Sequence, residues 1–176
     1  NGLHDVPIEP VRGALTDHYD PIARVVRLSE PVYYENSISA VSVACHEVGH
    51  AIQHQQSYSM LVIRHRMFPF VNFASGVAPF LLLAGFLFDF MNLVGIGIIF
   101  FSAAVAFQVV TLPVEFNASS RAMDQIVSTG LIRNNEERGA RKVLNAAALT
   151  YVAGALVALL ELARFIFMFI GMNDDD

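Results

Sequence analysis

Three long apolar stretches limit the folds open to this chain. They cover residues 68–88, 93–112 and 146–172 of a 176-residue sequence. A helix needs about 20 residues to cross the bilayer core, and each stretch is close to that length or longer. The composition agrees, because 55% of the residues are hydrophobic and only 15% are charged, more apolar than an ordinary soluble domain. We therefore predict a mainly α-helical integral membrane bundle with three transmembrane helices in this chain.

The first two stretches are predicted to form a transmembrane helical hairpin over residues 68–112. A short polar turn at 89–92 joins them, and two prolines inside the first stretch make a kink possible. A buried soluble hairpin is the alternative. The third stretch contains Glu161 and Arg164, three residues apart, which predicts an ion pair facing the bundle rather than a role in a reaction.

The distribution of basic residues predicts the orientation in the membrane. Ten of the 11 Lys and Arg residues, all but Arg164, fall on one side of the predicted spans. The positive-inside rule makes that side cytoplasmic. We expect a multi-pass protein of a bacterial inner membrane. The net charge of −5 argues against nucleic acid as a partner. Cys45 is the single cysteine, which excludes an intrachain disulfide and indicates a small buried thiol.

The first 36 residues differ from the rest, because they follow no helical pattern. Apolar residues among prolines at 6–11 indicate an irregular edge strand. Residues 16–21 read as a turn, and the β-branched run at 22–28 reads as a strand. We predict a small N-terminal β-hairpin, whose edge could bind an extended peptide by strand addition.

Residues 46–50 read His-Glu-Val-Gly-His, which is an H-E-x-x-H pattern. Ser39 and Ser42 are candidate N-caps and no proline lies between positions 31 and 69, so one helix is predicted from about 39 to 56. On that helix His46 and His50 share a face and can bind one zinc ion, while Glu47 can act as general base on a water that the ion activates. A surface helix with incidental histidines is the alternative.

A third protein ligand is needed, because a catalytic zinc ion takes three protein ligands and a water. His54 lies eight residues after His46, about 12 Å along a straight helix, which is too far to share the ion. It is predicted to support the site from outside the ligand set or to lie on the surface. Glu115 follows the second apolar stretch by about one turn, on the cytoplasmic side, and is the best carboxylate. An interfacial charge after Pro113 is the alternative reading.

Five segments of the chain resemble the YugP-type membrane zinc metallopeptidases. The resemblance spans nearly the whole sequence and implies a zinc-dependent membrane peptidase with His46, His50 and Glu115 as ligands and Glu47 as base. Members usually begin with one further transmembrane helix, which we expect to precede Asn1. The segments that carry the resemblance are 15–21 (Leu-Thr-Asp-His-Tyr-Asp-Pro), 26–30 (Val-Arg-Leu-Ser-Glu), 46–54 (His-Glu-Val-Gly-His-Ala-Ile-Gln-His), 111–119 (Thr-Leu-Pro-Val-Glu-Phe-Asn-Ala-Ser) and 142–151 (Lys-Val-Leu-Asn-Ala-Ala-Ala-Leu-Thr-Tyr).

More distantly, the chain is similar to gluzincins such as the HtpX heat-shock protease and the CAAX prenyl protease. Those carry an Asp four residues after the Glu ligand, which supports a zinc-binding histidine. This chain has Ser119 at that position. A hydroxyl can still hydrogen-bond an imidazole, and Asp17, Asp20 or Asp124 are alternative sources of support.

The predicted activity is hydrolysis of peptide bonds in protein or peptide substrates by a membrane-anchored endopeptidase. The oxyanion of such a reaction needs a donor besides zinc, and the candidates are His18, Arg121 and Tyr151. Two rival functions are a non-catalytic membrane scaffold stabilised by zinc and a protease that cleaves inside the bilayer. The predicted segments are 1–36 (β-hairpin region), 37–60 (zinc helix), 68–112 (transmembrane hairpin), 113–145 (cytoplasmic helices with the third ligand), 146–172 (transmembrane helix) and 173–176 (acidic tail).

Overall fold

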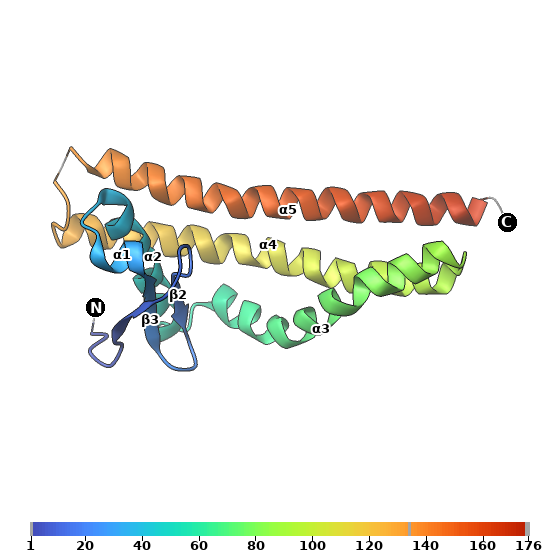
Figure 1. Ribbon diagram of the computed structural model, residues 1–176, viewed down its shortest axis with the longest axis horizontal. Helices are drawn as coiled ribbons and strands as arrows, with labels where there is room; N and C mark the ends of the chain where they lie inside the picture. Colours follow the sequence, from blue (N-terminus) through green and yellow to red (C-terminus); the bar gives the residue numbers. More distant parts are fainter. Residues whose placement is uncertain (1, 134, 175–176) are drawn as a thin grey trace. The chain divides into compact units, whose positions relative to one another are not determined.

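The computed structural model describes residues 2–133 and 135–174, so the end of the predicted acidic tail, 175–176, lies outside the described residues. The chain divides into two compact units, the first made of Asn1–Val62 and Pro113–Thr150, the second of Ile63–Leu112 and Tyr151–Asp176. The structure is mainly helical with a small N-terminal sheet, which confirms the predicted fold class. The elements are β1 (Ile8–Val11), β2 (His18–Asp20), β3 (Val25–Ser29), α1 (Glu30–Tyr34), α2 (Ile38–Gln55), α3 (Ser59–Leu87), α4 (Met91–Ser128) and α5 (Glu137–Asp174) (Figure 1).

The sheet of the first unit has the order β1-β3-β2. β2 and β3 are antiparallel and form a hairpin, while β1 pairs with β3 in parallel. The predicted strands at 6–11 and 22–28 therefore do pair, but in parallel, so a hairpin between them was wrong. The predicted bounds were wrong in two places: β2 lies inside the predicted turn at 16–21, and β3 starts three residues later than the predicted strand at 22–28. The reason is Asp20, whose Oδ1 accepts hydrogen bonds from the N–H groups of Ile22 (2.9 Å) and Ala23 (3.0 Å) and so moves the turn beyond β2.

The motif helix α2 begins at Ile38 because Ser37 caps it. The Ser37 side chain accepts the N–H of Ala40 at 3.1 Å. The predicted caps Ser39 and Ser42 were wrong. Ser42 lies one turn inside the helix, is buried, and donates to the Ile38 carbonyl at 2.7 Å.

Two apolar clusters hold α2 between the sheet and the other helices of the first unit, which Figure 1 shows with α2 beside β3. Against the sheet, Ala51 packs with Val26 and Leu28. On a neighbouring face, the thiol of Cys45 is buried, as predicted. Its cluster contains Cys45, Ala122, Met123, Ile126, Ala140 and Leu144. The apolar residues of α2 therefore fix the helix on both sides and leave a polar strip between them.

The backbones of α2 and α4 approach closely at Gly49. A Cβ at this position would lie 2.5 Å from the Ala118 carbonyl oxygen, a distance that real Cβ atoms do not reach. Only glycine therefore fits here. The close approach lets short side chains on α4 reach the histidines of α2.

The second unit contains the predicted helical hairpin, formed by the parts of α3 and α4 on either side of a turn at Asp89, which has φ 52°. Here too a glycine allows two helix backbones, those of α3 and α4, to approach closely, because a Cβ at Gly85 would lie 2.7 Å from the Val94 nitrogen. The prolines at 69 and 79 lie inside α3. In α5 of this unit, Glu161 and Arg164 form the predicted ion pair, but their side chains are 42% and 59% exposed, so the prediction that the pair faces the bundle was wrong.

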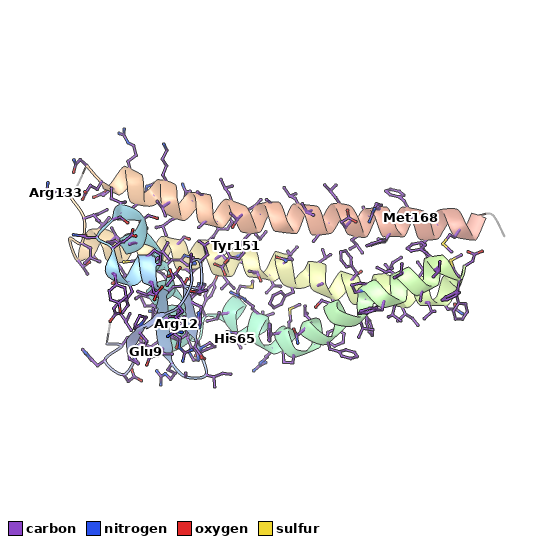
Figure 2. The ribbon with its side chains drawn as sticks, viewed as in Figure 1. Glu9, Arg12, His65, Arg133, Tyr151 and Met168 are labelled. Atoms are coloured by element: carbon purple, nitrogen blue, oxygen red, sulfur yellow. The ribbon has the colours of Figure 1, made fainter. Side chains whose placement is uncertain are left out.

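Within the described residues, three helices are long and apolar enough to cross a membrane, as predicted, although each extends beyond the predicted span. In the most apolar windows of Ser59–Leu87, Met91–Ser128 and Glu137–Met172, only 28%, 17% and 6% of the residues are buried. Met168 on α5, labelled in Figure 2, is one of the exposed apolar residues. So much exposed apolar surface requires a lipid or protein environment.

Candidate metal centre

The structure brings together the three residues predicted to bind zinc, all within the first unit. His46 and His50 come from α2, and Glu115 comes from α4. Oε2 of Glu115 lies 3.1 Å from Nε2 of His46 and 3.5 Å from Nε2 of His50. Each residue offers one ligand atom, and these atoms all lie within 4.8 Å of one another.

This donor set fits a zinc ion. Zinc bonds of about 2.0–2.1 Å in a tetrahedron place neighbouring ligand atoms about 3.3 Å apart, close to the separations of the carboxylate oxygen from the two nitrogens. Two imidazoles and a carboxylate are also a ligand set of catalytic zinc sites, in which a fourth position stays open. Among the described residues, this is the group of three that could hold a metal ion.

The site is largely shielded from solvent. The Glu115 side chain is 2% exposed, and those of His46 and His50 are 12% and 13% exposed. A carboxylate buried to this extent is costly unless a cation or donor compensates it. Burial lowers the pKa of His50, but the hydrogen bond to Glu115 and the charge of its carboxylate outweigh burial and place the pKa of His50 above its ordinary value.

Both histidines use Nδ1 for a contact outside the ligand group, so both Nε2 atoms face Glu115. Nδ1 of His46 lies 3.1 Å from Oγ of Ser119, and Nδ1 of His50 lies 3.0 Å from Oε1 of Gln53. Such outer contacts set the tautomer and the ring orientation of metal-binding histidines. Ser119, at the position where the gluzincins carry Asp, therefore contacts a histidine that is predicted to bind zinc.

The three aspartates considered as substitutes for Ser119 have other surroundings. The Asp17 carboxylate accepts the N–H of Ser29 at 2.8 Å as well as its hydroxyl. Asp20 pairs with Arg27 at 2.8 Å. Asp124 lines a pocket of about 220 Å³ between α4 and α5, together with Phe116, Ser119, Ser120, Met123, Arg141, Leu144 and Asn145.

Glu47 is buried beside the ligand group without belonging to it. The residue is 8% exposed, and the charges of His50 and His46 act on its carboxylate. Burial raises the pKa of Glu47 above its ordinary value, and the nearby His50 and His46 oppose this only in part. A buried carboxylate of raised pKa can accept a proton and return it.

Three other predicted site residues, His54, His18 and Tyr151, lie outside the ligand group. His54 meets the hydroxyl of Tyr19 through Nδ1 at 2.8 Å. His18 is exposed on β2, with Nδ1 2.7 Å from the Thr16 carbonyl oxygen. Tyr151 belongs to the second unit, so its part in the site stays a prediction.

Arg121, the remaining candidate, bridges α4 and the end of α2. Its Nε donates to Oδ1 of Asn117 and its Nη1 to Oε1 of Gln56, both at 2.7 Å. Sequence reasoning missed Gln53 and Asn117, which adjoin these groups. Their spacing is a usable signal, because Gln53 lies three residues after His50 and Arg121 four residues after Asn117, so each pair shares a helix face.

Comparison with known proteins identifies the family of this chain. A family model described as "Putative neutral zinc metallopeptidase" matches residues 1–170. A curated relative, "Putative membrane protease YugP" of Bacillus subtilis (strain 168), is 70% identical over 176 residues, which is all of this chain and 78% of the relative. No solved structure matches the chain. The name of the relative fits the three apolar helices of a membrane protein. The chain therefore belongs to the "Putative neutral zinc metallopeptidase" family.

Proposed function

We propose that this protein is a membrane-anchored zinc endopeptidase that hydrolyses peptide bonds of protein substrates at the cytoplasmic face. His46, His50 and Glu115 hold the ion, and Glu47 is the general base. The observation that carries the proposal is the position of Glu47, which is buried beside the ligand group without belonging to it. A purely structural zinc site has no use for such a carboxylate, and it is usually closed by four protein ligands.

The ligand group and the base divide the chemistry between them. When bound, zinc supplies Lewis acidity, which lowers the pKa of water and polarises a carbonyl. Glu47 takes a proton from the attacking water as its oxygen bonds to the scissile carbon, and returns that proton to the amine nitrogen as the C–N bond breaks. Burial prepares Glu47 for both steps, because its raised pKa makes it a better base and leaves its conjugate acid able to protonate the amine.

The activity test compares the parent chain with Glu47→Gln in detergent. Both proteins should bind one zinc ion per chain, because Glu47 is not a ligand. The variant should cleave casein about 10²–10⁴-fold more slowly, the range for loss of a general base. Glu35→Gln, at an exposed glutamate, is the matched control and should cleave like the parent. A chelator should abolish cleavage, and added zinc should restore it.

The same test separates the rival functions. If parent and variant both bind zinc and neither cleaves any protein, the non-catalytic scaffold is favoured. If the parent cleaves only a substrate whose scissile bond lies within a membrane span, the protein is an intramembrane protease. Equal cleavage by parent and Glu47→Gln would contradict the assigned base.

The cytoplasmic orientation is supported by the basic residues between the second and third apolar helices, among them Arg133 in the loop before α5 (Figure 2). Alkaline phosphatase, which folds only outside the cytoplasm, is the reporter. Fused after Asp176 it should be active, and inserted at Arg133 it should be inactive. The reverse result would place the site on the outer face.

A further inference from the structure

Gln53 is a fully buried amide that links the two helices of the metal centre. Its side chain is 0% exposed. Oε1 lies 3.0 Å from Nδ1 of His50, and Nε2 donates to the Val114 carbonyl at 2.8 Å and to Oδ1 of Asn117 at 2.9 Å. Both hydrogens of the amide and its oxygen therefore have partners. A buried amide with a complete set of partners costs little and is difficult to reorient.

The direction of these hydrogen bonds follows from Arg121. A guanidinium can only donate, so the Asn117 atom 2.7 Å from Nε of Arg121 must be the amide oxygen. That oxygen accepts, so the Gln53 group that faces it must be the NH₂. The Val114 carbonyl, which also only accepts, requires the same assignment. Oε1 of Gln53 is thereby turned toward His50, and the ring atom Nδ1 of His50 must carry the hydrogen.

We infer that Arg121, Asn117 and Gln53 form a one-directional hydrogen-bond chain that holds His50 as the Nδ1–H tautomer. Nε2, the atom that faces Glu115, is thereby left as the ring atom that would bind the metal ion. Gln53 is a positioning residue, because it acts through His50. The inference rests on the zinc-binding part of the proposed function.

His46 differs in a way that makes the inference specific. Its Nδ1 meets the hydroxyl of Ser119, which can either donate or accept. Ser119 therefore supports the ring of His46 but does not by itself select a tautomer. The chain from Arg121 dictates the proton position on His50 alone.

The first experiment measures zinc affinity by competition with a chromophoric chelator, on the full chain in detergent. Gln53→Leu should weaken zinc binding about 10–100-fold, as loss of a partner behind a metal ligand does. Gln55→Leu, at an exposed glutamine of the same helix, is the matched control and should bind zinc like the parent. Circular dichroism and thermal unfolding establish that each variant is folded.

Two variants at Asn117 test the direction of the chain. An Asp carboxylate accepts from both Arg121 and Gln53, so Asn117→Asp should keep the order and bind zinc within about threefold of the parent. Asn117→Leu leaves only the Val114 carbonyl to orient the Gln53 amide and should weaken binding about tenfold. A merely structural role for Asn117 predicts no such preference for an acceptor.

The tautomer itself can be observed by ¹⁵N NMR of histidine-labelled protein above pH 8 without added metal. The His50 signals, assigned by their loss in His50→Gln, should show hydrogen on Nδ1 in the parent and a mixture of tautomers in Gln53→Leu. This readout does not depend on activity. If Gln53→Leu fails to fold, the inference can still be tested with the parent spectrum and with the variants Asn117→Asp and Asn117→Leu.

Several outcomes would overturn the inference. They are a His50 ring without hydrogen on Nδ1 in the parent, zinc affinity of a folded Gln53→Leu equal to that of Gln55→Leu, or equal weakening by Asn117→Asp and Asn117→Leu. If the parent binds no zinc, the inference and the proposed function fall together. A parent that binds zinc but cleaves nothing refutes the peptidase, while the effect of Gln53→Leu on affinity still supports the chain.

Discussion

The two units of this protein bury different kinds of residue. In the first unit, Gln53 and Glu115 are almost completely buried, and each has a polar partner. In the second unit, large apolar side chains face outward, and Phe80 and Phe167 are 72% and 73% exposed. A buried polar group needs a particular partner at a particular place, whereas a lipid-facing side chain needs only to be apolar. The comparison teaches that single substitutions should have large effects in the first unit and small effects in the second.

Zinc removal should sharpen this difference most. A ligand present at 100 times its Kd stabilises the state that binds it by about 2.7 kcal/mol, and the proposed ligands lie in the first unit. Chelation should therefore speed hydrogen exchange of the α2 amides and leave those of α5 at 151–172 unchanged. Mass spectrometry of peptides from the two regions measures both in one sample. Equal acceleration in both regions would contradict the comparison.

The next largest effect concerns a pair of glycines, one in each unit. Gly49→Ala places a methyl group 2.5 Å from the Ala118 carbonyl oxygen, so α2 and α4 must separate, at a cost of about 1–3 kcal/mol. Zinc affinity should fall with it, because Glu115 then lies farther from the histidines. Gly76→Ala, on an exposed helical surface with nothing within 4 Å, should stabilise by roughly 0.5–1 kcal/mol. Thermal unfolding measures the stability of both variants, and chelator competition measures their zinc affinity. Equal changes in the two variants would contradict the expected difference between the units.

Removal of one buried methyl group should have a smaller effect of the same kind. Ile126 is 0% exposed in the cluster around Cys45, and Ile170 is 49% exposed on α5. Ile126→Val should lower the free energy of unfolding by about 0.5–1.5 kcal/mol. Ile170→Val should leave it almost unchanged. Denaturant titration in detergent distinguishes the two, and an equal loss would mean that α5 is packed against an unrecognised partner.

The apolar helices and the metal ligands could be predicted from sequence because their signals are local. Length and hydropathy indicate a membrane span without knowledge of its neighbours, and His46 and His50 reach one ion through the helical repeat alone. Glu115 needed one more step, an argument from charge about which side of the membrane the motif lies on. The structure brings these three residues together, and their role as ligands stays a prediction.

What could not be predicted depends on contacts between distant segments. The pairing of β1 with β3 joins Ile8 to Val26, and no local pattern specifies it. The role of Gln53 is hidden for the same reason, because its amide is oriented by Val114 and Asn117 on α4. Those contacts exist only where Gly49 lets the two backbones approach. The unpredictable part of the site is therefore the part that depends on packing.

The smallest expected effect is a pH dependence confined to the sheet. Hydrogen bonds from the Ala23 N–H and from Arg27 to the Asp20 carboxylate lower the pKa of Asp20 below its ordinary value. A lowered folded-state pKa means that the stabilisation is present above the unfolded pKa of about 3.9 and is lost as pH falls through the folded value. The sheet should therefore loosen below about pH 4.

Hydrogen-exchange protection of the β3 amides, corrected for the intrinsic rate at each pH, measures this loosening between pH 5 and pH 2.5. Asp20→Asn keeps the turn, because an amide oxygen can accept the same N–H groups, but it cannot titrate. The variant should start with slightly lower protection at pH 5 and show a flatter profile. Asp89→Asn, in the turn of the second unit, is the matched control and should retain the β3 profile of the parent. If Asp20→Asn retained the full loss of protection below pH 4, another carboxylate would have to hold the sheet.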